Sequence, residues 1–395
     1  KVVASASDDL ANKVVEEVSK NSTEENQTLS AHVLKAIVDS DSGKIDIINN
    51  DVKDIMIKQT IQSAQNQAGG TGVQQTQDMT SIVSDIIVNS NTETGSKMIE
   101  ELNNSSTDTE NDLSLQVISA ISEKDTTKLN TLSENNKEQI DTLTQSAVKN
   151  AGSSQESADL IAQVVANASD DFANQIIGEV TKNSIDENQA LSAKVMKSIV
   201  ETTPDKVENL SDENKDKLIS QTIEAAKNQA EGTSSDELDL SNTIAEIVTN
   251  SDTGTAAKVL ESLEEASNDS DSKLSLSVVS NLTKQENYEE KMEILSVTSS
   301  VVDQTINKLI EKAVENASSE EDLELVTDIV ENSKGTIGDK IVNSANKNEE
   351  SKKKITEVIV KVVEKNPEKA IEIIEKNKNT NTVHEAIKSK IENKE

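Results

Sequence analysis

The chain has 395 residues and a formal net charge of -34, because 73 Asp and Glu residues outnumber 39 Lys, and Arg is absent. The absence of cysteine excludes a disulfide framework and a Cys-ligated metal site, and no apolar run approaches the roughly 18 residues of a membrane-spanning helix. The acidic balance opposes binding to nucleic acid and to anionic lipid. Leu, Ile, Val and Phe together number 96, which supports packed structure but is little for one large globule.

The sequence repeats itself at two spacings. Residues Val2–Asp9 return as Val164–Asp171, an offset of 162, and Ile161–Val165 match Ile244–Val248, an offset of 83. Such self-similarity predicts tandem units of about 80 residues. We expect helical repeats at 1–80, 81–159, 160–242 and 243–323, followed by a divergent C-terminal repeat or cap at 324–395. Because Val2 already lies inside a repeat, we expect a mature form or a fragment of a longer protein.

Each unit predicts four or five helices. In chain order, the first long one carries an apolar stripe at helical spacing, from Leu10 to Val18, which recurs from Phe172 to Val180. The next stripe runs from Leu29 to Val38. A short helix follows, opened by Pro in two copies (Thr203-Pro204 and Asn366-Pro367), because Pro suits the first helical position.

A longer helix closes the unit, with Leu218 to Ala226 as one example and Ser211 as its expected cap. Another short helix, such as Ile244–Thr249, opens the next unit. It ends at an Asn in each of four copies, and Asn tolerates the left-handed conformation that can close a helix. These positions are Asn89, Asn167, Asn250 and Asn332.

Short amphipathic helices in tandem bury their stripes only by stacking on neighbours. We therefore predict an all-α fold, a tandem-repeat α-solenoid (superhelix) of about five units. About ten helix pairs would give a superhelix on the order of 100 Å long. A disordered acidic chain is the competing interpretation. Gly69–Gln77 and Glu231–Glu237 are the expected flexible joints.

No residues form a convincing chemical centre, so we predict no catalytic, cofactor-binding or metal site. His32 aligns with polar residues that change between copies and is expected on the surface, and His384 has no partner His. The loop from Asp39 begins like a calcium loop, but Gly43 is fifth and Asn50 twelfth, where an EF-hand needs Gly sixth and Glu twelfth. Asp252, Asp269 and Asp271 also lack a complete ligand set. We expect only weak, non-specific binding of divalent cations.

One charge asymmetry bears on function. Residues 351–395 carry 11 Lys and 8 Glu, a net charge of +3, so the other 350 residues carry -37. A basic end can dock on the acidic head of another copy, and a head-to-tail contact that does not close gives a filament. The alternative interpretation of this basic segment is a polar cap that ends the solenoid.

We predict a structural, non-catalytic repeat protein: a spacer, stalk, filament or surface-layer subunit whose partner is itself or another protein. The alternative is a helical-repeat scaffold for a protein partner, and an enzyme is the third hypothesis. No nucleic acid and no membrane span are expected. The expected location is extracellular or at the cell surface of a bacterium, with the cytoplasm as the alternative.

Overall fold

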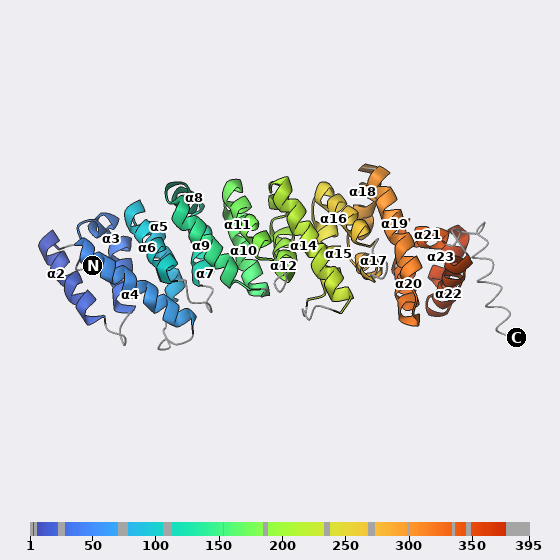
Figure 1. Cartoon of the computed structure of the whole chain (residues 1–395), viewed down its shortest axis with the longest axis horizontal. Coiled ribbons are helices and arrows are strands. Elements are labelled where there is room, and N and C mark those ends of the chain that lie inside the picture. Colours follow the sequence, from blue (N-terminus) through green and yellow to red (C-terminus); the bar gives the residue numbers. More distant parts are fainter. Residues whose placement is uncertain are drawn as a thin grey trace. The chain divides into compact units, whose positions relative to one another are not determined.

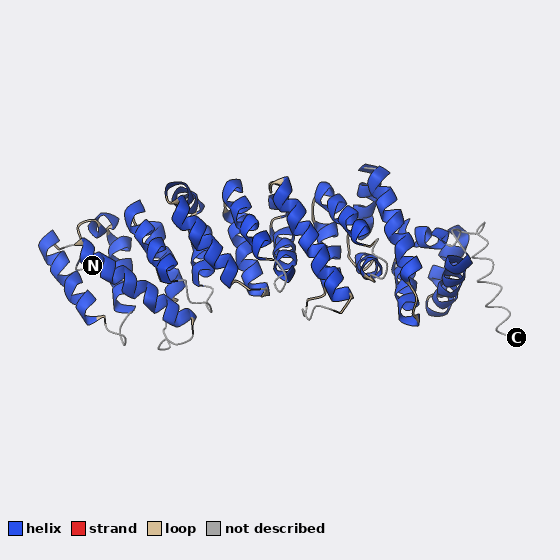
Figure 2. Cartoon of the chain, in the orientation of Figure 1, coloured by secondary structure: helices blue, strands red, loops and turns tan. Residues whose placement is uncertain are grey.

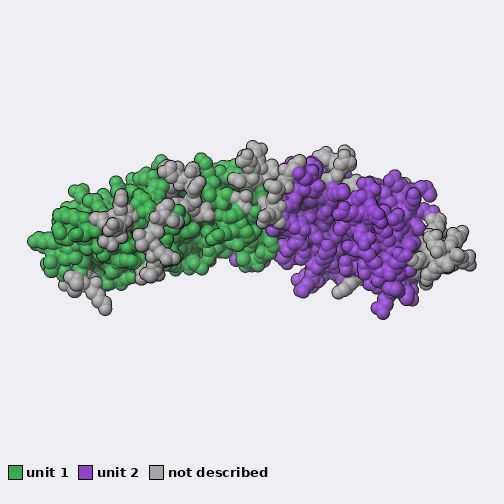
Figure 3. All heavy atoms as spheres, turned by 90° about the horizontal axis from the view of Figure 1, so that it is seen from below, with its two compact units in different colours: residues 1–202, 209–214 green, residues 203–208, 215–395 purple. Residues whose placement is uncertain are grey.

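The computed structural model describes most of the chain, and the structural statements below concern that part. The described residues are 3, 6–22, 28–69, 78–105, 113–152, 154–184, 189–232, 238–267, 273–298, 300–333, 336–344 and 349–376. Figure 3 shows two compact units. Unit 1 comprises residues 1–202 and 209–214, and unit 2 comprises residues 203–208 and 215–395.

Unit 1 is built from helices joined by short loops. They are α2 (Asp8–Asn21), α3 (Thr28–Ser40), the 3-10 helix η1 (Ser42–Ile45), α4 (Asn50–Ala68), α5 (Met79–Asn89), α6 (Thr92–Ser105), α7 (Leu113–Lys124), α8 (Thr126–Asn135), α9 (Lys137–Asn150), α10 (Gln155–Asn167), α11 (Asp170–Asn183) and α12 (Gln189–Thr202). The first three residues of α14 (Asp212–Ala230) also belong to this unit.

Unit 2 is likewise built from helices joined by short loops. Besides the rest of α14, it contains α13 (Pro204–Glu208), α15 (Leu240–Asn250), α16 (Thr253–Ala266), α17 (Leu274–Leu282), α18 (Tyr288–Thr298), α19 (Ser300–Asn316), α20 (Glu320–Asn332), α21 (Thr336–Ser344), α22 (Glu349–Lys365) and α23 (Pro367–Lys376). Helices account for all the regular structure in the described residues (Figure 2).

The helices of each unit form two layers (Figure 1). In unit 1, α3, α5, α7, α10 and α12 pack side by side in that order, and α2, α4, α6, α9 and α11 form the other layer. In unit 2 the corresponding layers are α15, α17, α20 and α22, and α16, α19 and α21. Long helices alternate between layers along the chain, so two consecutive ones make a hairpin and hairpins stack on hairpins. This is the predicted all-α tandem-repeat solenoid architecture, present in both units.

The apolar stripes lie between the layers. The side chains of Val15, Leu34, Ile61 and Val83 are at most 1% exposed, and so are those of Val165 and Ile177. Each fully buried aliphatic side chain contributes about 1.5–3 kcal/mol to stability. Because every hairpin contributes a few such residues, the core of each unit is thin and continuous, which explains how a chain with few large apolar residues folds.

Several predicted helix boundaries are confirmed. Pro204 and Pro367 each open a short helix, and the Asn366 side chain accepts a hydrogen bond from the Lys369 amide at 3.1 Å. Ser211 caps α14 by accepting from the Asn214 amide at 3.3 Å. The helix predicted at Ile244–Thr249 is longer, because Asp239 caps it and it begins at Leu240.

The prediction that an Asn in the left-handed conformation closes these helices is wrong. Asn89, Asn167, Asn250 and Asn332 each end a helix, but the residue that follows is extended, as at Ser90 with φ -82° and ψ 168°. The next hairpin helix begins two or three residues later, so an extended connection is sufficient. The predicted joint at Gly69–Gln77 lies almost wholly outside the described residues, and so does most of Glu231–Glu237. The predicted repeat boundaries remain predictions.

Candidate functional site

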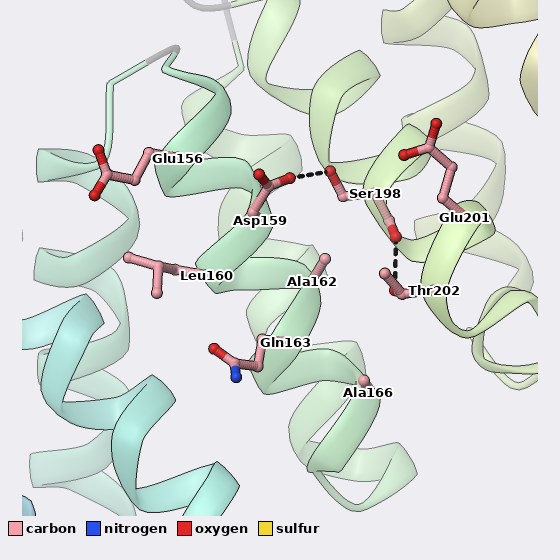
Figure 4. A pocket seen from close by; sticks show the side chains of 9 residues that line it. All are labelled: Glu156, Asp159, Leu160, Ala162, Gln163, Ala166, Ser198, Glu201 and Thr202. Carbon is pink, nitrogen blue, oxygen red and sulfur yellow. Dashed lines mark hydrogen bonds between the residues drawn. The ribbon is translucent and has the colours of Figure 1, made fainter.

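A hollow in unit 1 lies between α10 and α12 (Figure 4). Its volume is about 740 Å³, and Glu156, Asp159, Gln163, Ser198 and Glu201 supply its longer polar side chains. The Ser198 hydroxyl donates to Asp159 Oδ1 at 2.6 Å, and Gln155 Nε2 donates to the same oxygen at 2.8 Å. Ser198 and Asp159 thus join two packed helices, while Gln163 accepts a hydrogen bond from Ser119 on α7 and Glu201 pairs with Lys197 on its own helix.

A Ser–Asp contact is one part of a nucleophile–base pair, but its repeats indicate a structural role. The equivalent junction between neighbouring hairpins is bridged at three other places by different side chains. We call these contacts the Asp159 series: Lys124–Ser81, Ser198–Asp159, Gln285–Asn242 and Lys365–Glu324. Catalysis needs specific chemical groups, whereas a bridge between helices needs only a donor and an acceptor.

The histidines do not complete such a site. His32 lies exposed on α3, as predicted, while His384 lies outside the described residues. The triad mechanism requires an imidazole within hydrogen-bond reach of the nucleophile. Ser198 is bonded instead to Asp159 and Gln155.

The acidic loops considered for calcium are used as helix caps. Asp41 Oδ1 accepts from the Gly43 amide at 3.1 Å, and Asp39 pairs with Lys35 at 2.8 Å. Asp252 caps α16 by accepting from the Thr255 amide at 2.9 Å. Asp269 and Asp271 lie outside the described residues. Within the described ranges, no group of three or more His, Cys, Asp or Glu side chains is arranged to hold a metal ion.

Lysines from the short connecting helices bind the carbonyl groups at hairpin junctions. Lys128 Nζ donates to the Ser90 carbonyl at 2.7 Å, Lys44 donates to that of Ala6 at 3.2 Å, and Lys291 donates to that of Ser251. Burial lowers the pKa of Lys128 and of Lys291, although the charges of nearby aspartates oppose this effect. A cation at the carboxyl end of a helix satisfies free carbonyls and favours the helix dipole.

A second recurring contact joins neighbouring helices of the other layer. An Asp on one helix accepts from a Lys or Gln on the next, and we call these contacts the Asp54 series. Its members are Asp54–Lys97 (2.8 Å), Asp141–Gln175 (2.6 Å), Asp216–Lys258 (2.7 Å) and Asp303–Lys340 (2.7 Å). Each is partly exposed, so each contributes little energy but fixes the register of adjacent hairpins.

Two asparagines missed by the sequence analysis have equivalent roles. Asn12 Nδ2 donates to the Ile47 carbonyl at 2.8 Å and its Oδ1 accepts from the Asn49 amide. Asn174, 162 residues later, accepts from the Ser211 amide at 2.7 Å. The repeated position within each unit was the signal that could have identified them.

In the described part of the chain, no helix is both long and apolar enough to cross a membrane. No protein-family model matches the chain, and no curated protein matches it. One solved structure, described as a circular tandem repeat protein with novel repeat topology and enhanced subunit contact surfaces, is 16% identical. It covers 98% of this chain and 92% of that chain with a TM-score of 0.33.

A second solved structure, described as computational design of self-assembling cyclic protein homooligomers, is 15% identical. The alignment covers 92% of this chain and 99% of that chain, with a TM-score of 0.13. Scores this low do not establish a common fold. The architecture described above therefore rests on this chain's own helices and their packing.

Proposed function

We propose that the chain is a structural, non-catalytic repeat protein that associates with itself head to tail, as a spacer, stalk, filament or surface-layer subunit. The observation that carries the proposal is the Asp159 series. At the junction beside the hollow between α10 and α12, the side chains change from copy to copy while their bridging role persists. Selection for a bridge, rather than for chemistry, accounts for that pattern.

The charge distribution supports self-association. Residues 351–395 carry a net +3 while the rest of the chain carries -37, so the basic end of one copy is attracted to the acidic body of another. Attraction between exposed charges falls with ionic strength, because the Debye length shrinks from about 10 Å at 0.1 M salt to about 3 Å at 1 M. The proposed extracellular or cell-surface location rests on composition alone.

Negative-stain electron microscopy over a range of concentrations, at low and high salt, tests this function. We expect linear assemblies that lengthen with concentration and shorten as salt rises. Single particles at every concentration would contradict self-association and leave a spacer or a partner-binding scaffold.

One observation favours that scaffold as a second candidate function. On α18, which belongs to the stretch where the repeat pattern is weakest, Ile294 is 44% exposed and Val297 is 83% exposed. Exposed apolar neighbours on one helix are typical of protein contact sites. Immobilised wild-type protein and a Val297→Ser variant, compared for partners from the source cells, would reveal a protein that depends on this helix.

A further inference from the structure

The face of unit 1 that α2 and α3 present is an open apolar groove. It has a volume of about 470 Å³ and is lined by Lys13, Val14, Glu17, Val18, Asn21 and Leu29. Leu29 is 39% exposed, and Leu10, on the same helix stripe as Val14, is 50% exposed. The helices among the described residues leave these large apolar side chains exposed. We call this surface the N-terminal face.

The internal copy of this face shows what covers it. Leu10 corresponds to Phe172, which is 2% exposed, and Leu29 corresponds to Leu191, which is 0% exposed. In that copy α9 packs on α11 and α10 packs on α12. The apolar stripe of α11 therefore packs against the preceding hairpin, and not against a second stripe of the same kind. A partner that covers the N-terminal face must present the surface that α9 and α10 present to α11 and α12.

The charge of Lys13 also indicates that a preceding hairpin fits on this face. Lys13 occupies the position that Lys97, Gln175, Lys258 and Lys340 hold in the Asp54 series. Each of those four contacts an Asp of the preceding helix in its layer. Lys13 is exposed and makes no ion pair within the described residues. The missing partner is a carboxylate on a helix equivalent to α4, α9, α14 or α19.

Successive Asp residues of the Asp54 series are 87, 75 and 87 residues apart, so the same spacings after Asp303 lead to residues 378–390. Glu385, 82 residues after Asp303, is the single carboxylate in that range. Ile387 follows Glu385 by two residues, as Leu218 follows Asp216. Glu385 also belongs to residues 351–395, the segment of net positive charge, whereas residues 1–40 hold four Lys and seven acidic residues, a net -3.

We propose that the N-terminal face receives residues 377–395 of a second copy, with Glu385 of that copy opposite Lys13 and its apolar residues against Leu10 and Leu29. This assignment rests on the proposed function and names the surface through which it operates. The contact joins two different surfaces, so it propagates from copy to copy and does not close as a symmetric dimer.

The apolar part of the contact is tested by sedimentation velocity of the full chain. The double variant Leu10→Glu/Leu29→Glu places charges where burial is expected and should lower the association constant at least about tenfold. Ile55→Glu is the matched control, because Ile55 is 46% exposed on α4 and does not line the groove. It should change association less than about twofold. Circular dichroism should show the same helix content in all three proteins.

The charged part is tested by charge exchange. Lys13→Glu and Glu385→Lys should each weaken association about two- to fivefold, as expected for an exposed ion pair. Mixed in equal amounts, the two variants should recover wild-type association, because alternation of the copies restores an opposite pair at every contact. Recovery in the mixture, and not in either variant alone, is specific to head-to-tail pairing of residues 13 and 385.

The outcomes separate the two proposals. Wild-type protein that stays monomeric at every concentration removes self-association, and the assignment of the face falls with it. Oligomers that survive Leu10→Glu/Leu29→Glu, or a mixture that does not recover, overturn only the assignment of the face. A series that stops at dimers contradicts the head-to-tail contact, because that contact leaves a free face at each end.

Discussion

Helices α2 and α11 are identical at 8 of 14 positions but have contrasting surroundings. Both begin with two Asp residues and carry the same apolar stripe, yet Leu10 on α2 is 50% exposed while Phe172 on α11 is 2% exposed. The side chain of Glu179 on α11 is 11% exposed, whereas that of its counterpart Glu17 is 68% exposed. The apolar stripe therefore determines which side of a helix can pack against another helix. Whether that side is buried depends on the presence of a neighbouring hairpin.

The largest expected effect compares these two helices directly. Phe172→Ala should lower the free energy of unfolding by about 3–5 kcal/mol, because it opens a cavity among helices that cannot fully collapse. Leu10→Ala should cost less than about 1 kcal/mol in the monomer, since half of its surface is already in water. Urea denaturation followed by circular dichroism measures both. Equal losses would show that α2 is covered in solution.

A second comparison concerns one position near the start of α10 and α20. Ser157 and Asp322 are both the third residue of their helix, and both are buried. Burial alone would raise the pKa of Asp322, but hydrogen bonds from Ser319 and Ser318 and the Lys273 ammonium lower it to about 2. The folded pKa lies below the ordinary 3.8, so this stability is present above pH 4 and is lost as pH falls toward 2.

Asp322→Asn should therefore cost about 2 kcal/mol at pH 7 and almost nothing at pH 2. Thermal unfolding from pH 7 to pH 2 measures the difference from wild type. Ser157→Ala serves as the control, because its cost should not change with pH. A penalty for Asp322→Asn that persists undiminished at pH 2 would refute the charged role of this carboxylate.

Junction lysines provide a smaller contrast. Lys128→Met keeps the apolar stem but removes the bond to the Ser90 carbonyl, and should cost about 1 kcal/mol. Lys44→Met should cost less, because the bond of Lys44 to the Ala6 carbonyl is 3.2 Å long, compared with 2.7 Å at Lys128. Denaturant titration of both variants checks the ranking, and the opposite order would contradict it.

The smallest effect comes from the Asp54 series, in which Gln175 is the neutral member. Gln175→Lys would turn its 2.6 Å bond to Asp141 into an ion pair like those of the other junctions. We expect a change in stability within about 0.5 kcal/mol at low salt, which disappears at 1 M salt. A change that does not depend on salt would mean that the introduced ammonium group does not reach Asp141.

Local signals predicted much of the fold. The stripes from Leu10 and from Leu29 predicted α2 and α3, and Ser211, Pro204 and Pro367 marked helix starts, because caps and Pro act within one turn of the chain. The left-handed Asn was wrong for a non-local reason. The carbonyls of Ser90 and Ser251, which follow two of these Asn residues, are bound by lysines 38 and 40 residues away, so these helix ends need no local closure.

The contacts between hairpins were not predictable in the same way. Members of the Asp54 series are separated by 43, 34, 42 and 37 residues, because the intervening loops and short helices differ in length. No constant spacing identifies the partner until the layer of each helix is known. The sequence could not predict that Lys13 is exposed and unpaired in the described residues, because the residues around it match those around its paired copies.

The exact spacing of Asn12 and Asn174 has a consequence for how such a molecule changes in evolution. Both asparagines tie a helix to the loop that precedes the next hairpin, and they lie 162 residues apart. Unequal recombination that removed residues 12–173 would join Ala11 to Asn174 inside one intact helix. The helices that follow it would be those that now follow α11. The gene can thus lengthen or shorten its product by whole periods while the Asn contact to the loop is kept at each remaining copy.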